Sequence, residues 1–495
     1  MHLENQPVER QPSNLRVRSE GTGGVIRQKS KQEKLVLLKQ DIAIAFILSG
    51  CFFFSYLDRS SLGNARIMGL QADLGLTDAQ FMNCLMMFFV GYMVFELPAA
   101  LSLRIFQPPH VYGIAIALFG VFACCLSVSR TYAAVMVLRL LIGIGEAVVQ
   151  TGFVYLSLWY LKDELATRYA VFYFSAPLAG GINGILAYGI DKNLNNVSGK
   201  AAWEWLFLIE GVCSVFWGVI VFFILPRLPE RVAEKGSLLF RREEEQAIIL
   251  QRTIEARNDP DAKFQAFQIW WALKDPKTWL DAVVVAAPCL DVAAFGNFLP
   301  TFVNQFGFSK LNAQLFTLIP YSVAMLTLPL FSLASDRARK KAIPTLLCLT
   351  VSVIGFVILL CDVQRSVLIV GCCLVAAGSY PAIVLAASWL LVNHAGYTKR
   401  STAWAVAQIF IQCYSIISTQ VYIHPPRFIM GHAVLLALNA LGVVAGLLKY
   451  YIMKRENARR DRLAQQVIGE ALESKEEEKS IEQLCDYHPD FRYSF

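Results

Sequence analysis

Apolar segments of about 20 residues recur along the chain, and they constrain its fold more than any other feature. Each is long enough to cross the hydrocarbon core of a bilayer as a helix. Because only helices and closed barrels satisfy their own backbone polar groups in lipid, the pattern predicts an all-helical membrane protein. About twelve spans fall into two groups of six, at 42–62, 81–103, 110–129, 132–156, 169–190 and 204–225, and at 279–302, 312–334, 342–362, 366–392, 402–422 and 430–451.

This spacing divides the chain into five parts. They are an N-terminal tail (1–40), a six-helix bundle (41–225), a central loop (226–278), a second six-helix bundle (279–452) and a C-terminal tail (453–495). The central loop is charged, so we interpret it as a linker that lets the two halves move. The C-terminal tail is also charged and is expected to be a solvated helix or disordered.

Composition and charge agree with a membrane location. Hydrophobic residues make up 56% of the chain and charged residues only 17%, which is too apolar for a soluble enzyme. Of the 45 Lys and Arg residues, roughly 36 fall on the side of the two termini and roughly 8 on the other. Both termini are therefore expected in the cytoplasm, with the plasma membrane as the expected location. The net charge of +7 is explained by this topology and not by nucleic-acid binding.

The chain offers little for catalysis. Its 12 cysteines lie mainly in apolar segments without a C-x-x-C pair, no histidine falls in the middle of a span, and no phosphate-binding G-x-x-x-x-G-K-[ST] loop occurs. We therefore expect no enzyme activity, no metal site, no cofactor and no ATP. The expected partners are a small-molecule substrate, protons and the lipid bilayer, with the chain acting as a monomer.

Short segments in both bundles carry a family resemblance. In chain order they are "YLDRSSLGNARIMGLQADLGL", "WYLKDELATRYAVFY", "WEWLFLIEG", "LKDPKTW", "FLPTFV", "ASDRARKK" and "YTKRSTAWA". This ordered set, covering about 41–452, resembles the fungal allantoate permease branch (anion:cation symporter family) of the major facilitator superfamily. The resemblance implies a pair of six-helix bundles that import organic anions, such as ureides, nicotinate and other vitamins, together with protons.

The chain departs from the family pattern in two places. The loop after the second span, "LSLRIFQPPH", lacks the usual aspartate, whereas its counterpart after the eighth span, "SDRARKK", keeps Asp336 and Arg337. We therefore predict that Asp336 and Arg337 act in a gate built on the second half. In "LDRSSLGNA", Ser61 replaces the asparagine that is usual in the family.

Charges inside the apolar segments indicate where a solute would bind. A charged side chain at the bilayer centre costs about 2.5–3.5 kcal/mol on insertion scales, so such residues should face protein or a wet cavity. Arg139 and Glu146 share one face of a helix but lie roughly 10 Å apart along its axis, too far for a close salt bridge. Asp58 and Glu210 fall near the level of Arg139, and Asp291 falls near the level of Glu146.

We predict that Arg139 binds the carboxylate of the substrate and that Glu146 or Asp291 carries the proton. The other predicted substrate-binding residues are polar or aromatic groups of three spans: Asp58, Arg59, Asn297, Trp389 and Asn393.

Each assignment has a structural alternative. Arg139 could be fixed in an ion pair between helices, and Asp58 with Arg59 could form an interfacial salt bridge. Glu210 is expected to be structural. The small-residue pairs Gly143–Ala147 and Gly180–Gly184 are typical of close helix packing.

The sequence thus favours a proton-coupled importer of a small organic anion that works by alternating access. An exporter of a fungal secondary metabolite is the first alternative, because acids outnumber arginine in the spans. A nutrient sensor built on a transporter scaffold is the second.

Overall fold

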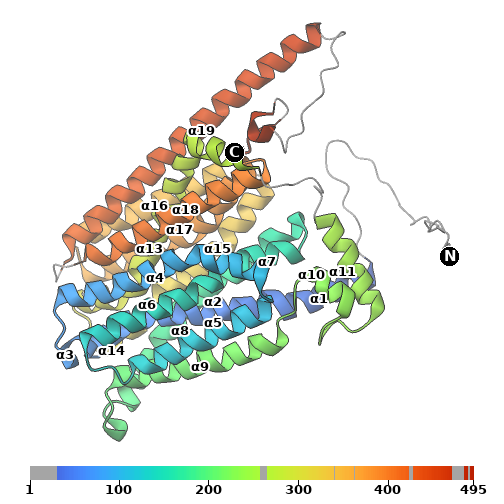
Figure 1. Ribbon diagram of the computed structural model, residues 1–495. Coiled ribbons are helices and arrows are strands. Elements are labelled where there is room, and N and C mark those ends of the chain that lie inside the picture. Colours follow the sequence, from blue (N-terminus) through green and yellow to red (C-terminus); the bar gives the residue numbers. More distant parts are fainter. Residues whose placement is uncertain are drawn as a thin grey trace.

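The computed structural model describes residues 30–256, 265–338, 340–361, 363–422, 427–470, 484–488 and 491–495. Across these ranges the regular secondary structure is helical. The long helices lie side by side in one bundle. The N-terminal half, blue to green, lies against the C-terminal half, yellow to red (Figure 1).

The N-terminal half begins with three helical pieces that continue into one another, because α1 and α2 are joined by a π-helical turn. Its elements are α1 (Lys31–Gln40), η1 (Asp41–Phe46), α2 (Ile47–Ile67), α3 (Leu70–Asp73), α4 (Asp78–Ile105), α5 (Pro108–Leu126), α6 (Tyr132–Gln150), α7 (Gly152–Trp159), α8 (Lys162–Asn193), η2 (Val197–Gly199) and α9 (Ala202–Ile224).

Three short helices connect this half to the next: α10 (Pro229–Lys235), α11 (Glu243–Ala256) and α12 (Ala266–Lys274). The C-terminal half then contains α13 (Pro276–Gln305), α14 (Lys310–Phe316), α15 (Leu318–Ala338), α16 (Ala342–Leu360), α17 (Arg365–Asn393), α18 (Tyr397–Gln420), α19 (Ile429–Glu470) and η3 (Cys485–Tyr487).

Eleven helices in the described residues are long and apolar enough to cross a membrane. The predicted span at 402–422 corresponds to α18, which has sufficient length but falls outside this group because polar residues lower its hydropathy. The helix packs against α13 and α4, and Ala405, Ile409 and Cys413 line its exposed face. A helix covered by protein on two sides needs fewer apolar residues than one that faces lipid, which explains the difference.

Local sequence sets where several helices begin. Thr77 starts α4 with a capping box, in which its hydroxyl accepts from the amide of Gln80 and the Gln80 side chain accepts from the amide of Thr77. Asp275 starts α13 by accepting from the amide of Lys277. These caps satisfy amides that the helices themselves leave unpaired.

The two halves touch where glycines let their backbones approach. A Cβ atom on Gly63 would lie 2.3 Å from the carbonyl oxygen of Asn297, and one on Gly184 would lie 2.4 Å from the hydroxyl oxygen of Thr317. Gly180 similarly packs against the ring of Tyr321. The predicted close packing at Gly180 and Gly184 is confirmed. These contacts lie toward the end of the bundle that carries α3 and α14, which we call the opposite end (Figure 1).

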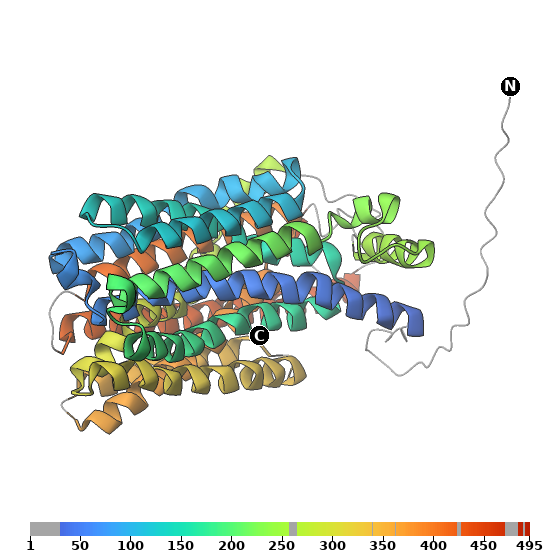
Figure 2. The ribbon, with the colours of Figure 1, turned by 90° about the horizontal axis from the view of Figure 1, so that it is seen from below.

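The other end carries α1, α10, α11 and the last residues of the chain, and we call it the terminal end (Figures 1 and 2). Here α11 is fixed to the N-terminal half, because the Arg252 guanidinium donates to Glu33 of α1 at 2.9 Å and also contacts Glu164 of α8. In contrast, α12 packs against α18 and α13 of the C-terminal half. The described parts of the central loop are therefore attached one to each half.

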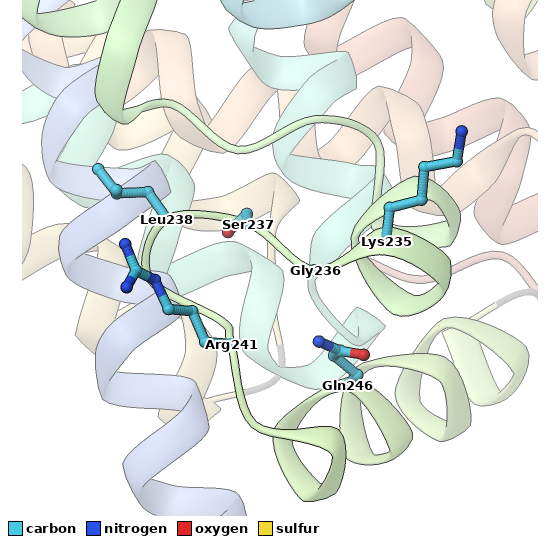
Figure 3. Close-up of a pocket in the computed structure, with 6 residues that line it drawn as sticks. All are labelled: Lys235, Gly236, Ser237, Leu238, Arg241 and Gln246. Carbon is cyan, nitrogen blue, oxygen red and sulfur yellow. The ribbon is translucent and has the colours of Figure 1, made fainter.

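The loop between α10 and α11 holds a surface pocket of about 440 Å³. Its lining includes two cations, Lys235 and Arg241, but their side chains point in different directions (Figure 3). This pocket lies in the connecting loop and not among the membrane helices, so it does not match the substrate site that the sequence predicts.

One sequence expectation is wrong for the described end of the chain. The C-terminal tail was expected to be solvated or disordered, but Cys485, Asp486 and Tyr493 are buried against the C-terminal half. The charged residues between Met453 and Glu470 do form a helix, as an extension of α19.

Candidate functional site

Two ion pairs join α2 to α6 in the N-terminal half. In the first, the Arg139 guanidinium donates to the Asp58 carboxylate at 3.0 Å. Both side chains are almost completely buried, with exposed fractions of 1% and 2%. Asp58 thus neutralises Arg139 from another helix, which is the structural alternative to substrate binding that the sequence leaves open for Arg139.

The second pair joins Arg59 to Glu146. The Arg59 Nε atom donates to Glu146 at 2.8 Å, and the Ser55 hydroxyl donates to the same carboxylate oxygen at 2.5 Å. Glu146 is fully buried, whereas the Arg59 side chain keeps 19% of its surface exposed. Arg59 is thus the most accessible of the four charged groups.

Helix geometry explains how these neighbours separate. Asp58 and Arg59 follow each other on α2 and diverge by roughly 100°, so they reach different groups. Arg139 and Glu146 are two turns apart on the same face of α6. Ser55 lies one turn before Arg59, which places both side chains at Glu146.

The two arginines share contact with one aromatic ring. The guanidinium carbons of Arg59 and Arg139 each lie 5.0 Å from the ring centre of Phe88 on α4. Gly143 allows this arrangement, because a Cβ atom there would lie 2.1 Å from the Phe88 carbonyl oxygen. The predicted close packing at Gly143 is confirmed, and the ring makes a cation–π contact with both arginines.

A second cluster of polar side chains lies beside the ion pairs. Ser61 donates to Glu210 of α9, and the Asn183 amide of α8 donates to Ser60, to Ser61 at 3.0 Å and to the Leu57 carbonyl at 3.1 Å. All of these side chains are buried. The residue that departs from the family pattern, Ser61, is therefore part of a helix-packing network.

Asp291 has a different environment in the C-terminal half. Its carboxylate accepts hydrogen bonds from Ser352 at 2.7 Å, Ser379 at 2.6 Å and Asn439 at 2.6 Å. No ion pair to Asp291 occurs among the described residues. The other buried acid of α13, Asp281, contacts Lys449 and His394.

A hydrogen bond links the two halves near Arg59. The Gln408 amide of α18 donates to Glu96 of α4 at 2.5 Å. Glu96 lies one turn after Tyr92, whose ring centre is 5.0 Å from the Arg59 guanidinium carbon. This bond brings a C-terminal helix to the edge of the charged cluster.

The remaining predicted residues lie outside this cluster. The Asn297 amide donates to the Ala293 carbonyl of its own helix. Trp389 and Asn393 donate to the carbonyl of Ser494 in the C-terminal tail. Asp336 contacts Lys341, and Arg337 is exposed at the end of α15. These contacts give no support to substrate binding by Asn297, Trp389 or Asn393.

Sequence reasoning missed several members of the site: Ser55, Phe88 and the Ser352–Ser379–Asn439 set. Ser55 could have been found from its one-turn spacing to Arg59. The others come from helices far apart in the sequence, and nothing in their local pattern marks them.

The fold and this buried charge network define a multi-pass membrane transporter. Residues 48–419 match the Major Facilitator Superfamily, and the chain belongs to this family. It is 30% identical over 480 residues to the high-affinity nicotinic acid transporter of Saccharomyces cerevisiae, which covers 95% of this chain and 87% of the relative. A second relative is the MFS-type transporter cnsO of Penicillium expansum, with 28% identity over 93% of this chain and 90% of the relative.

Solved structures agree on the fold. The inward-facing, partially occluded xylose transporter XylE of E. coli superposes with a TM-score of 0.61 at 13% identity, covering 83% of this chain and 98% of that chain. Membership of this family makes the protein a secondary transporter and not an enzyme. Among the described residues, no group of three or more His, Cys, Asp and Glu side chains could hold a metal ion.

Proposed function

We propose that the protein imports a small organic anion together with a proton, as a member of the allantoate permease branch acting as a monomer. The observation that carries the proposal is the Arg59–Glu146 pair. It combines a buried acid with a partly exposed cation in the middle of a membrane helix bundle. A carboxylate that enters the bundle can reach Arg59 without breaking the Arg139–Asp58 pair.

Coupling follows from competition for Arg59. When a substrate carboxylate takes the guanidinium in a charge-assisted hydrogen bond, Glu146 loses its cation. An uncompensated charge is costly in the membrane, so Glu146 then binds a proton. After the halves rock to the other side, loss of that proton restores the Glu146 carboxylate, which regains Arg59 and displaces the substrate.

This scheme refines the role predicted for Arg139. Arg139 is 1% exposed and already bonded to Asp58, so a direct substrate contact would leave Asp58 unpaired. We assign carboxylate binding to Arg59, and give Arg139 and Asp58 the task of fixing α2 against α6. Glu146 takes precedence over Asp291 as the proton carrier, because only Glu146 shares a cation with the substrate.

The substrate class follows from the surroundings of Arg59. Tyr56, Phe88 and Tyr92 place their ring centres within 5.6 Å of its guanidinium carbon. Such rings can stack on a compact aromatic anion. Since a relative carries the name nicotinic acid transporter, we propose pyridine carboxylates as the first solutes to test.

The proposed direction requires a cytoplasmic terminal end in the plasma membrane. A reporter cysteine at Lys235, in the α10–α11 region, should then be inaccessible to an impermeant thiol reagent on intact cells. One at Lys200, near the opposite end, should be labelled. Labelling at both positions would contradict this topology.

Uptake by a fungal strain that lacks nicotinate transport tests the function. The strain should accumulate one labelled carboxylate of a panel containing nicotinate, ureides, other vitamins and organic cations, and more so at external pH 5 than at pH 7. Accumulation of a cation alone, or the same accumulation at both pH values, would overturn the proposal.

Glu146→Gln separates coupling from binding. Glutamine resembles the protonated acid, so the variant should exchange internal for external substrate at a normal rate but fail to accumulate it against a gradient. Glu234→Gln, in the exposed part of α10, is the matched control and should accumulate normally. Full accumulation by Glu146→Gln would show that another group carries the proton, and Asp291 would then be the next candidate.

One observation favours the alternative hypothesis of export. Asp291 is bonded only to neutral groups among the described residues, and such an acid would attract a cationic solute. Loss of resistance to a cationic metabolite on deletion of the gene, without an uptake defect, would favour export. A variant without flux that still signals normally would favour the sensor hypothesis.

A further inference from the structure

The last described residues of the chain, 484–488 and 491–495, pack on the terminal end of the C-terminal half. We call them the C-terminal strap. Asp486 is its main anchor. The Asp486 carboxylate accepts from Lys277 at the start of α13 at 2.8 Å and contacts Lys399 at the start of α18. Lys399 also bonds Asp275 at 2.8 Å, so two lysines and two carboxylates form one buried network.

Aromatic rings of the strap cover this network. The Tyr493 hydroxyl accepts from Lys277 at 2.5 Å and donates to Asp486 at 2.9 Å. The ring centre of Tyr487 lies 4.1 Å from the Lys399 ammonium, which adds a cation–π contact. The strap thus fits the lysines by both charge and ring contacts.

A second anchor lies at the end of α17. The Ser494 amide donates to Asn393 at 2.7 Å, and its carbonyl accepts from Asn393 at 3.1 Å and from Trp389 at 3.2 Å. The Lys341 amide, just before α16, donates to the carbonyl of Phe495 at 2.8 Å. Trp389 and Asn393, which the sequence predicts as substrate-binding residues, donate to the strap in this structure.

A third anchor comes from the extension of α19. Arg460 donates to the carbonyl of Asp486 at 2.8 Å and to that of Phe491 at 2.7 Å. Asn457 exchanges two hydrogen bonds of 3.0 Å with the backbone of Tyr493. The strap therefore joins the terminal ends of α13, α16, α17, α18 and α19.

We propose that the C-terminal strap is a tethered peptide ligand of this surface, and that it slows closure of the terminal end by splinting the C-terminal helices together. The surface recognises an acidic residue, Asp486, together with two tyrosines, Tyr487 and Tyr493, that contact the same pair of lysines. The proposal rests on the transporter fold and not on the substrate or the coupling ion.

The position of the strap explains why it should slow closure of the terminal end. Glycine-mediated contacts hold the halves together toward the opposite end, so access at the terminal end changes when helix ends there move. The last turn of α17 and the first turn of α18 are both bonded to the strap. Bending of these two helices relative to α13 and α19, which the strap also bonds, has to stretch those bonds.

The first experiment measures docking. Cys485 is buried and its sulfur lies against Gly396, so an intact strap should protect it from a thiol reagent, as read by mass spectrometry of its peptide. Asp486→Asn leaves two buried lysines short of a carboxylate and should raise the labelling rate at least tenfold, roughly, as expected when a buried pair loses a partner.

The matched control is Asp461→Asn. Asp461 bonds Arg492 of the strap at 2.9 Å but is 61% exposed. The labelling rate of Cys485 in this variant should therefore stay within about twofold of wild type. Fast labelling of wild-type Cys485 would show that the strap is not docked and would overturn the proposal.

The second experiment measures closure without substrate. Fluorophores attached through noncanonical amino acids at Lys235 and at Ala338, both exposed, report single-molecule switching between the halves. Asp486→Asn should switch several-fold faster than wild type, and Asp461→Asn should match wild type. An undocked strap with an unchanged switching rate would overturn the splint while leaving the transport proposal untouched.

A milder variant covers the case in which Asp486→Asn does not fold. Tyr493→Phe removes one hydroxyl that bonds both Lys277 and Asp486. It should raise Cys485 labelling and switching together, by about fivefold for a lost buried hydrogen bond. A rise in labelling alone would again contradict the splint.

Discussion

Glu146 in the N-terminal half and Asp291 in the C-terminal half are both fully buried acids of membrane helices, but their neighbours differ. Glu146 bonds Arg59 and Ser55, while Asp291 bonds two serines and an asparagine. One acid depends on a cation that a solute can also bind. The other depends on neutral groups that stay with their own helices.

The difference separates two ways to keep an acid inside a membrane protein. An ion-paired acid changes its charge when another anion takes its partner, so its protonation is linked to substrate binding. An acid held by neutral donors has no such link, because its hydrogen bonds contribute about 0.5–1.5 kcal/mol each whether or not substrate is present. The N-terminal half therefore has the chemistry for coupling, and the C-terminal half has the chemistry of a fixed polar centre.

The largest effect, on the amount of folded protein, is expected when the buried Arg139–Asp58 pair of the N-terminal half is broken. Arg139→Ala removes the cation from Asp58, and loss of one partner of a buried pair costs about 3–5 kcal/mol. We expect little folded protein at the cell surface, measured by fluorescence-detected size-exclusion chromatography.

The double variant Arg139→Ala with Asp58→Asn is the control for that loss. It no longer contains an unpaired buried charge and should recover most of the folded protein. If folded protein stays low in the double variant, the pair is not what Arg139 contributes. If Arg139→Ala folds and fails only in transport, Arg139 binds substrate as the sequence predicts.

Asp291→Asn tests the same comparison in the C-terminal half. No ion pair is broken among the described residues, so the free energy of unfolding should fall by only about 1–3 kcal/mol through weakened hydrogen bonds. Proton-driven accumulation should survive, because Glu146 carries the proton in our scheme. Lost accumulation with intact exchange would transfer the proton role to Asp291 and would remove the contrast between the halves.

Much of this architecture is predictable from sequence. Apolar length fixes the membrane helices, because a span has to satisfy its backbone inside lipid whatever its partners are. The spacing of glycines predicts close contacts at Gly143, Gly180 and Gly184. A helix without a side chain at these positions can approach any neighbouring helix closely, whichever helix that is. The charges that lie inside the bundle could also be found, because each is costly in lipid.

Partners across helices were much harder to predict. Rise per residue places Asp58 near the level of Arg139, but it does not show which way either side chain faces, so the sequence leaves a choice between Asp58 and the substrate that the fold decides for Asp58. For Arg59 the sequence predicts substrate binding or a salt bridge with Asp58 at the membrane interface, but in the fold its long side chain reaches Glu146 of α6. The sequence does not predict the strap, because polar residues such as Asp486 are typical of a solvated tail. Their partners, Lys277 and Lys399, lie far away in the sequence and meet them only in the folded chain.

A third prediction concerns loops rather than spans. Only the second half keeps the acidic residue of the loop motif, and there Asp336 bonds Lys341. With Asp336 about half exposed, the pair is worth up to about 1 kcal/mol, so Asp336→Asn should slow conformational exchange by about two- to fivefold and leave substrate affinity unchanged. Equal losses in exchange and affinity would count against a gate and would make the loop part of the binding site.

The smallest expected effect is a pH response of the C-terminal strap. Burial opposes ionisation of Asp486, but Lys277 and Lys399 overcome it and hold the pKa of Asp486 well below its ordinary value. A depressed pKa contributes stability that is complete above the unfolded value of about 3.9 and is lost only as pH falls through the folded value. Tyr487 and Tyr493 are the other groups that face Asp486, and Asp275 shares Lys277 and Lys399 with it. Between pH 7.5 and 5 the strap should therefore stay docked, and hydrogen exchange of the peptide containing Asp486, corrected for its intrinsic pH dependence, should change less than about twofold. A larger rise at pH 5 would mean that a group with an ordinary pKa controls docking, and the C-terminal half would then contain a proton-sensitive element of its own.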